Sequence, residues 1–426
     1  MKNRVYWLEN LSESEASSIP VDDLSETCDV AVIGGGLTGL STAFHLAGRG
    51  VSVSIFENNS IGSGASMRNA GMTLTGFKLS PDELLNRYGK EHAARLYRTS
   101  LEAIDFAEKF IQDQGIHCDF FRCGALWAAY AKRHYKGFDA TQRLLKGTFS
   151  HETYTVASRD LKGELGSSFY CGGLVDPQSA GVNPVKLTRG LLKSALAAGV
   201  CIYEHTPVTA MTCRNRHYHL QTSRGAVRAE KVVIATNGYT LPFLGSLRRR
   251  VIPVVSYIIV TEALSPDIAQ ELIPHGRMVF DTKYLLYYFR LVGGNRLLFG
   301  GRVSFAKMSD RTAAEKLQHE MRGVFPQLKS FQMEYYWSGN VCFTFDQLPH
   351  LGRENGIYYA LGYCGHGVAM SLYSGCNLAK MIMDELVDNP LQKLAFTPRF
   401  YYRKKPWFLP LAGAYYKIID GFARRG

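Results

Sequence analysis

The first third of the chain alternates short runs of β-branched residues with amphipathic stretches. An apolar run at residues 30–33 leads into the glycine-rich residues 34–39, and a second β-branched run ends at Glu57. Between them, apolar and small side chains recur at helical spacing on one face: Leu40, Ala43, Phe44 and Ala47. The pattern predicts a strand, a glycine turn, a helix and a second strand over residues 28–57.

Helical spacing recurs further along the chain. Apolar residues follow it from residue 81 to 114, which predicts one or two helices outside the nucleotide-binding unit. Asn183 and Pro184 are typical of an N-cap and a first helical position, so a helix is expected to run to Ala198. Further helices are expected at residues 312–324 and 368–386.

Strand patterns dominate the remaining sequence. Residues 245–336 alternate apolar and polar positions and are rich in aromatic side chains, and Gly293, Gly294 and Asn295 predict a hairpin turn. Other strands are expected at residues 200–203, 218–222 and 232–235 and in the stretch ending at Leu361. Together these patterns predict an α/β protein.

The first glycine turn has the spacing of a dinucleotide-binding site. Gly34 would make the tight turn, Gly36 would let a pyrophosphate approach the backbone, and Gly39 would let helix and strand pack closely. Glu57 follows Gly39 by 18 residues, near the place of the acid that binds the ribose hydroxyls. An ordinary glycine-rich turn is the alternative, but the flanking elements favour a nucleotide. The phosphates would also meet the N–H groups of the first helical residues, Leu37 and Thr38.

Two further stretches are expected to touch a cofactor. Residues 58–72 are too rich in small side chains to predict a regular element, and Arg68 and Asn69 bring donors for phosphate or ring oxygens. A plain surface loop is the alternative there. The strand at residues 232–235 stops at Thr236 and Gly238, as a backbone crossing beside a nucleotide would.

Length and composition indicate a globular protein that can bury a large core. The 426 residues, 46% hydrophobic and 20% charged, are expected to form two or three folding units. No apolar run is long enough for a membrane helix, the N-terminal residues lack the apolar core of a secretory signal, and the nine cysteines are dispersed. A cytoplasmic protein without a metal site is therefore expected.

Half of the net charge of +12 lies in the last 28 residues. A basic tail interleaved with aromatic residues could bind an anionic partner, either a lipid surface or RNA. The alternative, which we favour, is a solvated arm packed on its own domain. Against Asp420, the tail carries Arg399, Arg403, Lys404, Lys405, Lys417, Arg424 and Arg425.

The sequence resembles the FAD-dependent amine and amino-acid oxidases of the D-amino-acid oxidase (DAO) superfamily, which includes glycine oxidase and sarcosine oxidase. Within it, the chain is most similar to γ-glutamylputrescine oxidase-like proteins, through stretches such as SYIIVTEAL, DTKYLLYYFRL and RLLFGGR. The shared motifs occur in the family's order from residue 28 to 385: GGGLTGLSTAFHLAGRG with Glu57, GASMRNAGM, IATNGYT, the W-S-G string at residues 337–339 with T-F-D and P-H-L-G after it, and GYCGHGVAM.

The resemblance implies non-covalent FAD and a Rossmann-type FAD-binding domain interleaved with a mixed, largely antiparallel-sheet substrate domain. The FAD domain would take residues 28–80, 150–244 and 337–390, the substrate domain residues 81–149 and 245–336, and the tail residues 391–426. Cys364 lies near the expected flavin edge, but the covalent attachment of some relatives uses a different motif. The implied FAD contacts, beyond those above, are Ser66, Arg68, Asn69 and Gly71 along the pyrophosphate and ring, Val208 beside adenine, and Gly365, His366, Gly367 and Val368 at the flavin's pyrimidine edge.

The family reaction removes a hydride from the carbon beside an amine and leaves an imine, which water hydrolyses to an aldehyde or oxo acid. Dioxygen usually reoxidises the flavin, which gives hydrogen peroxide. The expected partner is a small-molecule amine, and no specific nucleic acid is expected. The candidate catalytic residues are His366, Tyr257 and Tyr288, although a structural role for His366 is the alternative.

Two departures from the family bear on the substrate. Val341 stands where amino-acid-oxidising relatives are expected to carry a carboxylate-binding arginine, so a simple α-amino acid is disfavoured unless Arg290 or Arg302 substitutes. Tyr287 stands where the γ-glutamylputrescine type is expected to have an acid, which weakens the case for a cationic polyamine. The aromatic residues expected to line a pocket, or else to form sheet core, are Tyr257, Tyr287, Tyr288 and Phe289.

Three alternatives stay open. A glycine- or sarcosine-type amino-acid oxidase would share every cofactor motif. A flavoenzyme that modifies transfer RNA would suit the basic charge, although no aromatic-basic RNA-binding module is present in the sequence. A membrane-surface dehydrogenase that reduces quinone would place the basic aromatic tail on lipid. Outside the flavin motifs, Asp346 is expected to stabilise a turn and His350 to support the site from behind.

Overall fold

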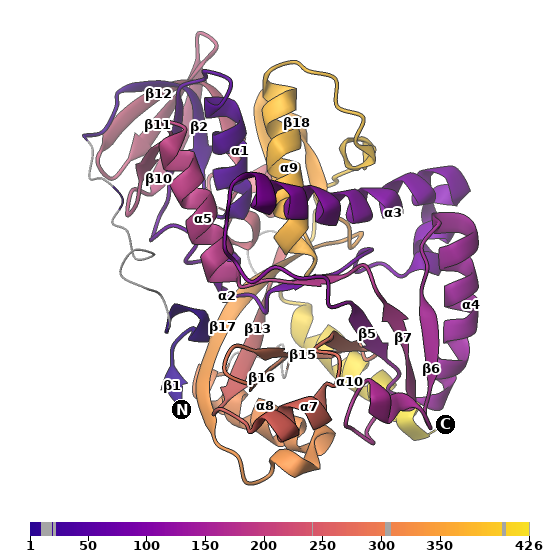
Figure 1. Cartoon of the computed structure of the whole chain (residues 1–426). Coiled ribbons are helices and arrows are strands. Elements are labelled where there is room, and N and C mark those ends of the chain that lie inside the picture. Colours follow the sequence, from indigo (N-terminus) through magenta and orange to yellow (C-terminus); the bar gives the residue numbers. More distant parts are fainter. Residues whose placement is uncertain (10–18, 20–22, 241, 303–307, 403–405, 426) are drawn as a thin grey trace.

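A parallel sheet around β2 forms the nucleotide-binding side of the protein (Figure 1). The computed structural model describes residues 1–9, 19, 23–240, 242–302, 308–402 and 406–425. Strands β3, β2, β12 and β19 run in parallel, so their carboxyl ends meet at one edge of the sheet. The strands of this sheet are β2 (Thr27–Ile33), β3 (Val53–Phe56), β9 (Cys201–Tyr203), β10 (Val208–Arg214), β11 (His217–Thr222), β12 (Gly225–Ile234), β18 (His350–Glu354) and β19 (Ile357–Leu361).

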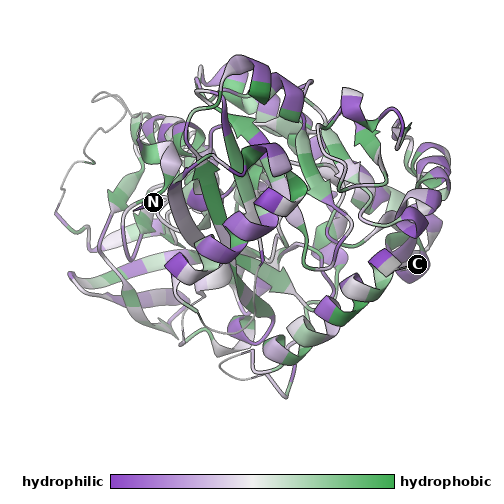
Figure 2. Cartoon of the chain, turned by 90° about the horizontal axis from the view of Figure 1, so that it is seen from below, coloured by the Kyte–Doolittle hydropathy of each residue, from purple (hydrophilic) through white to green (hydrophobic). Residues whose placement is uncertain are grey.

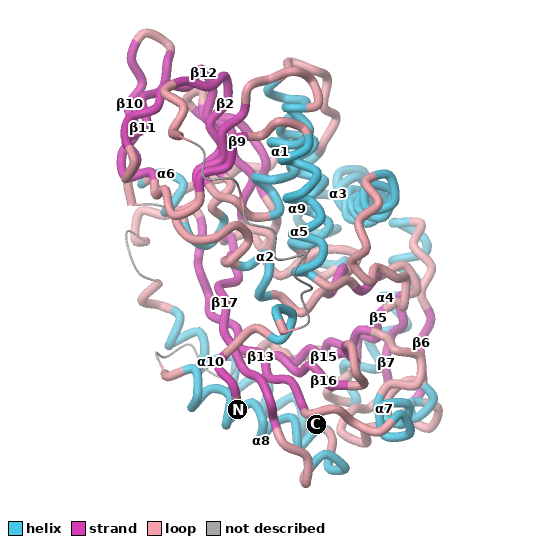
Figure 3. The backbone as a smooth tube through the Cα atoms, turned by 60° about the vertical axis from the view of Figure 1, so that its left-hand side comes forward, coloured by secondary structure: helices cyan, strands magenta, loops and turns pink. Residues whose placement is uncertain are grey.

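Helices cover one face of this sheet. Figure 3 shows α1 (Leu37–Ala47), α5 (Pro184–Ala197) and α9 (Gly367–Ile382) side by side, and α1 packs against both of the others. The α1–α9 approach requires Gly375, because a Cβ atom there would lie 2.6 Å from the Ser41 side chain. Helix α3 (Pro81–Asp113) packs on α9 and shares its core, so it is not separate from the nucleotide-binding unit as the sequence led us to expect.

The second large sheet is mostly antiparallel. Among the described residues its strand order is β1-β17-β13-β16-β15-β14-β5-β7-β6, and α8 packs against β13 and β17. The strands are β1 (Lys2–Asn3), β5 (Ala125–Ala128), β6 (Tyr154–Ala157), β7 (Gly172–Asp176), β13 (Val251–Thr261), β14 (Met278–Asp281), β15 (Tyr287–Val292), β16 (Arg296–Gly301) and β17 (Met333–Thr344). The other elements are the paired β4 (Met72–Thr73) and β8 (Ala180–Gly181), and the helices α2 (Ala65–Arg68), α4 (Lys132–Phe149), α6 (Gly245–Arg248), α7 (Pro266–Leu272), α8 (Asp310–Val324) and α10 (Leu409–Arg425).

Most of the predicted elements are confirmed, with two differences. Residues 28–57 form the predicted strand, turn, helix and strand, and the Asn183 side chain accepts N–H groups at the start of α5. The stretch expected to be irregular contains the single-turn helix α2. Helix α3 is two helical segments joined at Gly89, which has a φ of 71°, and this agrees with the one or two helices expected. Strands β6 and β7 belong to the second sheet, although residues 150–244 were assigned to the FAD-binding domain. The division into domains itself stays a prediction.

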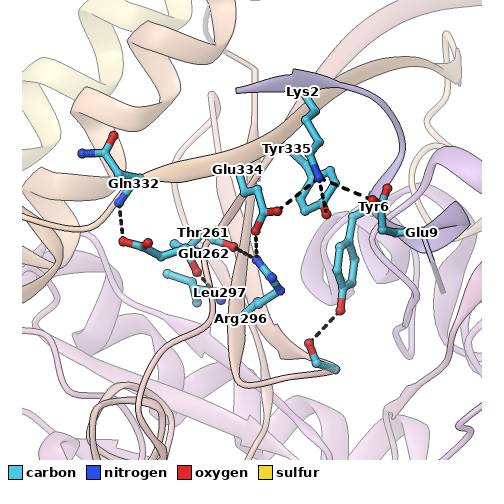
Figure 4. A network of polar contacts seen from close by, with 11 residues as sticks. Lys2, Tyr6, Glu9, Thr261, Glu262, Arg296, Leu297, Gln332, Glu334 and Tyr335 are labelled. Atoms are coloured by element: carbon cyan, nitrogen blue, oxygen red, sulfur yellow. Dashed lines mark hydrogen bonds and ion pairs between the residues drawn. The ribbon is translucent and has the colours of Figure 1, made fainter.

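The N-terminal residues are fixed to the second sheet. Strand β1 pairs in parallel with β17, and Figure 4 shows the Lys2 ammonium beside the Glu334 carboxylate and Tyr6 donating to a backbone carbonyl, which belongs to Gly293. Val5, Tyr6 and Trp7 are buried and form an aromatic anchor for the N-terminal residues. Trp7 Nε1 then donates to the carbonyl of Asn69 at 2.9 Å, so the anchor supports the cofactor loop.

The C-terminal tail forms helix α10, which packs on its own protein as favoured from the sequence. The Asp420 carboxylate accepts the N–H groups of Tyr284 and Leu285, and Figure 2 shows α10 at the surface near the C-terminus. Its outer face is apolar and exposed at Leu411, Tyr415, Ile418 and Phe422. No helix in the described part of the chain is long and apolar enough to cross a membrane. Contact of this tail with a membrane surface stays a prediction; residues 403–405, part of its basic charge, lie outside the described residues.

Candidate active site

One large cavity joins the two sheets. Its volume is about 1240 Å³, larger than the roughly 300–1,000 Å³ of pockets for drug-sized ligands. The lining begins at the carboxyl edge of the parallel sheet, at Gly34 and Glu57, and continues to the second sheet, at Ser256 and Tyr288. The cavity therefore has room for a dinucleotide and a small substrate.

The predicted glycines set how closely backbone segments approach. Gly34 has a φ of +109°, and a Cβ atom there would lie 2.9 Å from the carbonyl oxygen of Ala235. A Cβ atom on Gly36 would lie 2.7 Å from Ser66 Oγ, and one on Gly39 would lie 2.0 Å from the carbonyl oxygen of Gly34. Gly34 and Gly36 line the cavity, whereas Gly39 lies behind it. Gly39 thus permits close helix–strand packing and is not itself a lining residue.

Glu57 is held in place at the nucleotide end. Its carboxylate accepts the N–H groups of Gly35 at 2.8 Å and Asn59 at 2.9 Å, and it lines the cavity together with Val208. The remaining carboxylate lone pairs can accept hydroxyl groups of a ribose. At the start of α1, Leu37 and Thr38 also line the cavity, as predicted.

The loop after β3 lines the cavity, and several of its side-chain donors bind protein carbonyls. The Arg68 guanidinium donates to the carbonyls of Ser63 at 2.8 Å and Ser338 at 3.1 Å, and the Asn69 amide donates to Ala65 and Ser66 carbonyls. Both amide hydrogens of Asn69 are therefore taken by the loop itself. The Arg68 guanidinium has further N–H groups, so its contact with the phosphates or the flavin ring stays a prediction. Ser66, Arg68 and Asn69 line the cavity.

Gly71 does not line the cavity, contrary to expectation. Its φ is +67°, and a Cβ atom there would lie 2.0 Å from the carbonyl oxygen of Val182. The absence of a side chain at Gly71 therefore allows β4 to pair closely with β8 behind the site.

The late glycine–histidine corner meets the same cavity. Thr236, Gly238 and residues 365–368 all line it, and His366 lies directly before α9. The Nδ1 atom of His366 is buried without a hydrogen-bond partner among the described residues. Burial, reinforced by the charge of Lys78, lowers the pKa of His366 to about 4, so the imidazole is neutral at pH 7. This unpaired atom and the glycine cradle fit a bound flavin nucleotide.

Only one of the four predicted aromatic lining residues faces the cavity. Successive side chains on a strand point to opposite faces, so Tyr288 lines the cavity while Tyr287 and Phe289 enter the core on the other side of the sheet. Tyr257 belongs to that same core, whereas Ser256 lines the cavity. Tyr257, Tyr287 and Phe289 are therefore sheet core. The Tyr288 hydroxyl lies 2.9 Å from Ser256 Oγ.

The two candidate arginines have different positions. Arg290 is buried and donates to the carbonyls of Gly71 at 2.7 Å and Val182 at 3.2 Å, away from the cavity. Arg302 lines the cavity, and its guanidinium carbon lies 5.0 Å from the centre of the Phe343 ring. Val341 lines the cavity at the place where relatives were expected to carry arginine.

Sequence reasoning missed several lining residues. Lys78 lies between Phe77 and Leu79, which are buried in the core, so its side chain is directed into the cavity. An apolar–lysine–apolar triplet was the only available signal. Also missed were His151 and Asp176, which lie 3.1 Å apart, and Tyr284 and Tyr402.

The region behind the corner is built as expected. Asp346 accepts the N–H of Leu348 in a turn, and its carboxylate lies 3.0 Å from His350 Nε2. His350 stacks on Phe396 and does not line the cavity. Within the described residues, no group of three histidine, cysteine or acidic side chains could hold a metal ion.

Comparisons with known proteins agree with this site. A family model described as "FAD dependent oxidoreductase" (DAO) matches residues 29–381. The chain is 36% identical to a probable oxidoreductase OrdL of Haemophilus influenzae, over 93% of each chain. It is 33% identical to the gamma-glutamylputrescine oxidoreductase of Escherichia coli, over 85% of this chain and 86% of that protein.

A solved structure extends the match to three dimensions. The crystal structure of glycine oxidase from Geobacillus kaustophilus superimposes with a TM-score of 0.74, covering 88% of this chain and all of that one, at 24% identity. At this identity the likeness shows the fold alone, an FAD-type nucleotide-binding layer interleaved with a second sheet.

Proposed function

The chain belongs to the DAO family of FAD-dependent oxidoreductases, and we propose that it oxidises an amine of the γ-glutamylputrescine type. The carbon beside the amine would lose a hydride, and water would hydrolyse the resulting imine to an aldehyde or oxo acid. FAD, held without a covalent bond, would accept the hydride and pass the electrons to dioxygen, giving hydrogen peroxide.

The continuity of the cavity carries this proposal. The nucleotide end, at Gly36 and Glu57, opens directly into a chamber on the second sheet. There Val341, Phe343 and Ile258 offer an apolar wall where an amino-acid oxidase would need an arginine fork. An alkylamine chain suits this wall better than a short, doubly charged α-amino acid.

The residues of the chamber would position the substrate rather than remove its proton. Burial raises the pKa of the Tyr288 phenol to about 12, so it stays protonated at neutral pH and can donate a hydrogen bond. His366 is neutral, and its free Nδ1 could accept or donate a single proton. A neutral amine needs no strong base, so binding, orientation and exclusion of water suffice.

An amino-acid oxidase of the glycine or sarcosine type is the second candidate. Arg302 favours it, because a guanidinium that lines the cavity could replace the missing arginine fork. The two candidates differ in whether the carboxylate is bonded to the carbon that is oxidised.

The decisive experiment mixes the FAD-loaded enzyme with individual amines without oxygen. We expect γ-glutamylputrescine or another ω-amine to bleach the flavin absorbance, and readmitted air to produce hydrogen peroxide. Tight, stoichiometric turnover of glycine, sarcosine or D-alanine would instead establish the second candidate. Bleaching without peroxide would assign a dehydrogenase. The cytoplasmic location stays a prediction.

A further inference from the structure

Lys78 places a positive charge in the cavity, and no described residue accepts a hydrogen bond from it. Its loop is fixed at both ends, since Gly76 N–H donates to Ser100 Oγ at 2.8 Å and Ser80 caps α3. Phe77 and Leu79 hold the backbone in the core on either side of it. Among the described residues no acceptor hydrogen-bonds to the Lys78 ammonium, and burial followed by the charge of Arg302 lowers its pKa.

Arg302 brings another positive charge to the same cavity. It follows directly on β16, and its guanidinium lies against the Phe343 ring. Burial lowers the pKa of Arg302 to about 10, which still leaves it charged at neutral pH. Two like charges in a partly desolvated cavity repel each other, and a bound anion would lower that repulsion.

The acids of the lining do not supply that anion. Glu57 is bound to backbone N–H groups at the nucleotide end. Asp176 is held by Thr75 and Ser179, each at 2.6 Å. Asp281 accepts the N–H groups of Lys283 and Tyr287 and pairs with Lys283.

From this arrangement we infer that Lys78 and Arg302 form an anion subsite, which binds a carboxylate of the amine substrate away from the carbon that is oxidised. The inference rests on the proposed amine oxidation and narrows its substrate to amines that also carry an acid group. Such a subsite would accept the glutamyl carboxylate of a γ-glutamylated amine. It would reject a simple polycation such as putrescine by like-charge repulsion.

The first test needs no turnover. The FAD-loaded enzyme is titrated with acetate, and with acetamide as the neutral analogue of the same shape, while the flavin absorbance is followed. We expect acetate, but not acetamide, to perturb the spectrum. The Lys78→Met variant should bind acetate about tenfold or more weakly, because one charge-assisted contact is lost. Lys316→Met, an exposed lysine on α8, is the matched control.

The second test uses a pair of substrates of equal length, 5-aminopentanoate and pentylamine. The ratio of their kcat/KM values should favour the acid in the native enzyme and fall about tenfold in Lys78→Met or Arg302→Met. Equal acetate binding in native and Lys78→Met enzymes overturns the subsite, as does an unchanged ratio. A changed flavin reduction potential with unchanged acetate affinity would assign Lys78 to the cofactor instead. If no amine bleaches the flavin, the proposed function fails, while the acetate titration still decides the subsite.

Discussion

The ring of Tyr416 lies parallel to the ring of Tyr284, with centroids 4.8 Å apart and 5° between the planes. Tyr284 lines the cavity, whereas Tyr416 belongs to α10 near the end of the chain. The neighbouring Arg424 guanidinium lies 4.4 Å from the centre of the Phe169 ring. The C-terminal helix therefore packs behind the cavity-lining loop that carries Tyr284, which the charge of the tail alone did not indicate.

We predict that Tyr416→Ala raises the KM for the amine several-fold and lowers the stability of the enzyme. An offset aromatic pair contributes about 0.5–1.5 kcal/mol, and its loss would free the loop that carries Tyr284. Steady-state kinetics and urea unfolding measure the two effects. Tyr415→Ala is the matched control, because the adjacent Tyr415 is 61% exposed on the outer face. Equal effects of the two substitutions would show that α10 does not support the site.

Gly39→Ala should destabilise the nucleotide-binding unit and reduce its FAD content. The new Cβ atom would lie 2.0 Å from the Gly34 carbonyl oxygen, and such overpacking costs about 1–3 kcal/mol. Gly48→Ala, at the other end of α1, is the control: its φ is −62° and the nearest atom is 3.4 Å away. Unfolding monitored with FAD absorbance would separate them. If Gly39→Ala retains native FAD content and stability, close packing at this turn is not required.

The nucleotide half of the site could be predicted because its signals are local. Gly34, Gly36 and Glu57 act within one strand–turn–helix–strand unit, so sequence spacing fixes their geometry. The substrate half depends on which face of a sheet each strand presents. Nothing within DTKYLLYYFRL tells which of Tyr287 and Tyr288 faces the ligand, since both positions are aromatic and either register buries one.

Other residues escaped prediction because their partners are remote in sequence. The Arg68 guanidinium donates to the carbonyl of Ser338, 270 positions away, a contact that no local pattern indicates. Lys78 has no motif around it, and only the folded structure brings it to the cavity that Arg302 also lines. The role of Tyr416 required the path of the tail, which no periodicity could supply.

His366 should make the enzyme sensitive to acid. Burial first, and then Lys78, hold its pKa at about 4, below the ordinary value of 6.5, so the unfolded chain binds the proton more readily. The free energy of unfolding is therefore unaffected by this group above pH 6.5 and decreases as the pH falls from 6.5 toward 4. The loss is at most about 3 kcal/mol from this group, at 1.36 kcal/mol per pKa unit.

Urea unfolding of the FAD-loaded enzyme at pH 7 and pH 5 tests this dependence. The difference between the two pH values should shrink in His366→Gln, which keeps a neutral polar side chain. The control His319→Gln, on the exposed side of α8, should leave the difference between the two pH values unchanged. An equal pH dependence in native and His366→Gln enzymes would place the acid-sensitive group elsewhere, with His45, whose burial also lowers its pKa to about 4, the next to substitute.

FAD should leave the protein on acid precipitation, although a thiol lines the cavity. Cys364 Sγ donates to the Gly362 carbonyl at 3.1 Å, and burial raises the pKa of the thiol to about 12. Attack on a flavin requires the thiolate, which is scarce at neutral pH under these conditions. We therefore expect the yellow colour in the supernatant for both the native enzyme and Cys364→Ser. Colour retained in the native pellet but released from Cys364→Ser would instead identify Cys364 as a covalent attachment site.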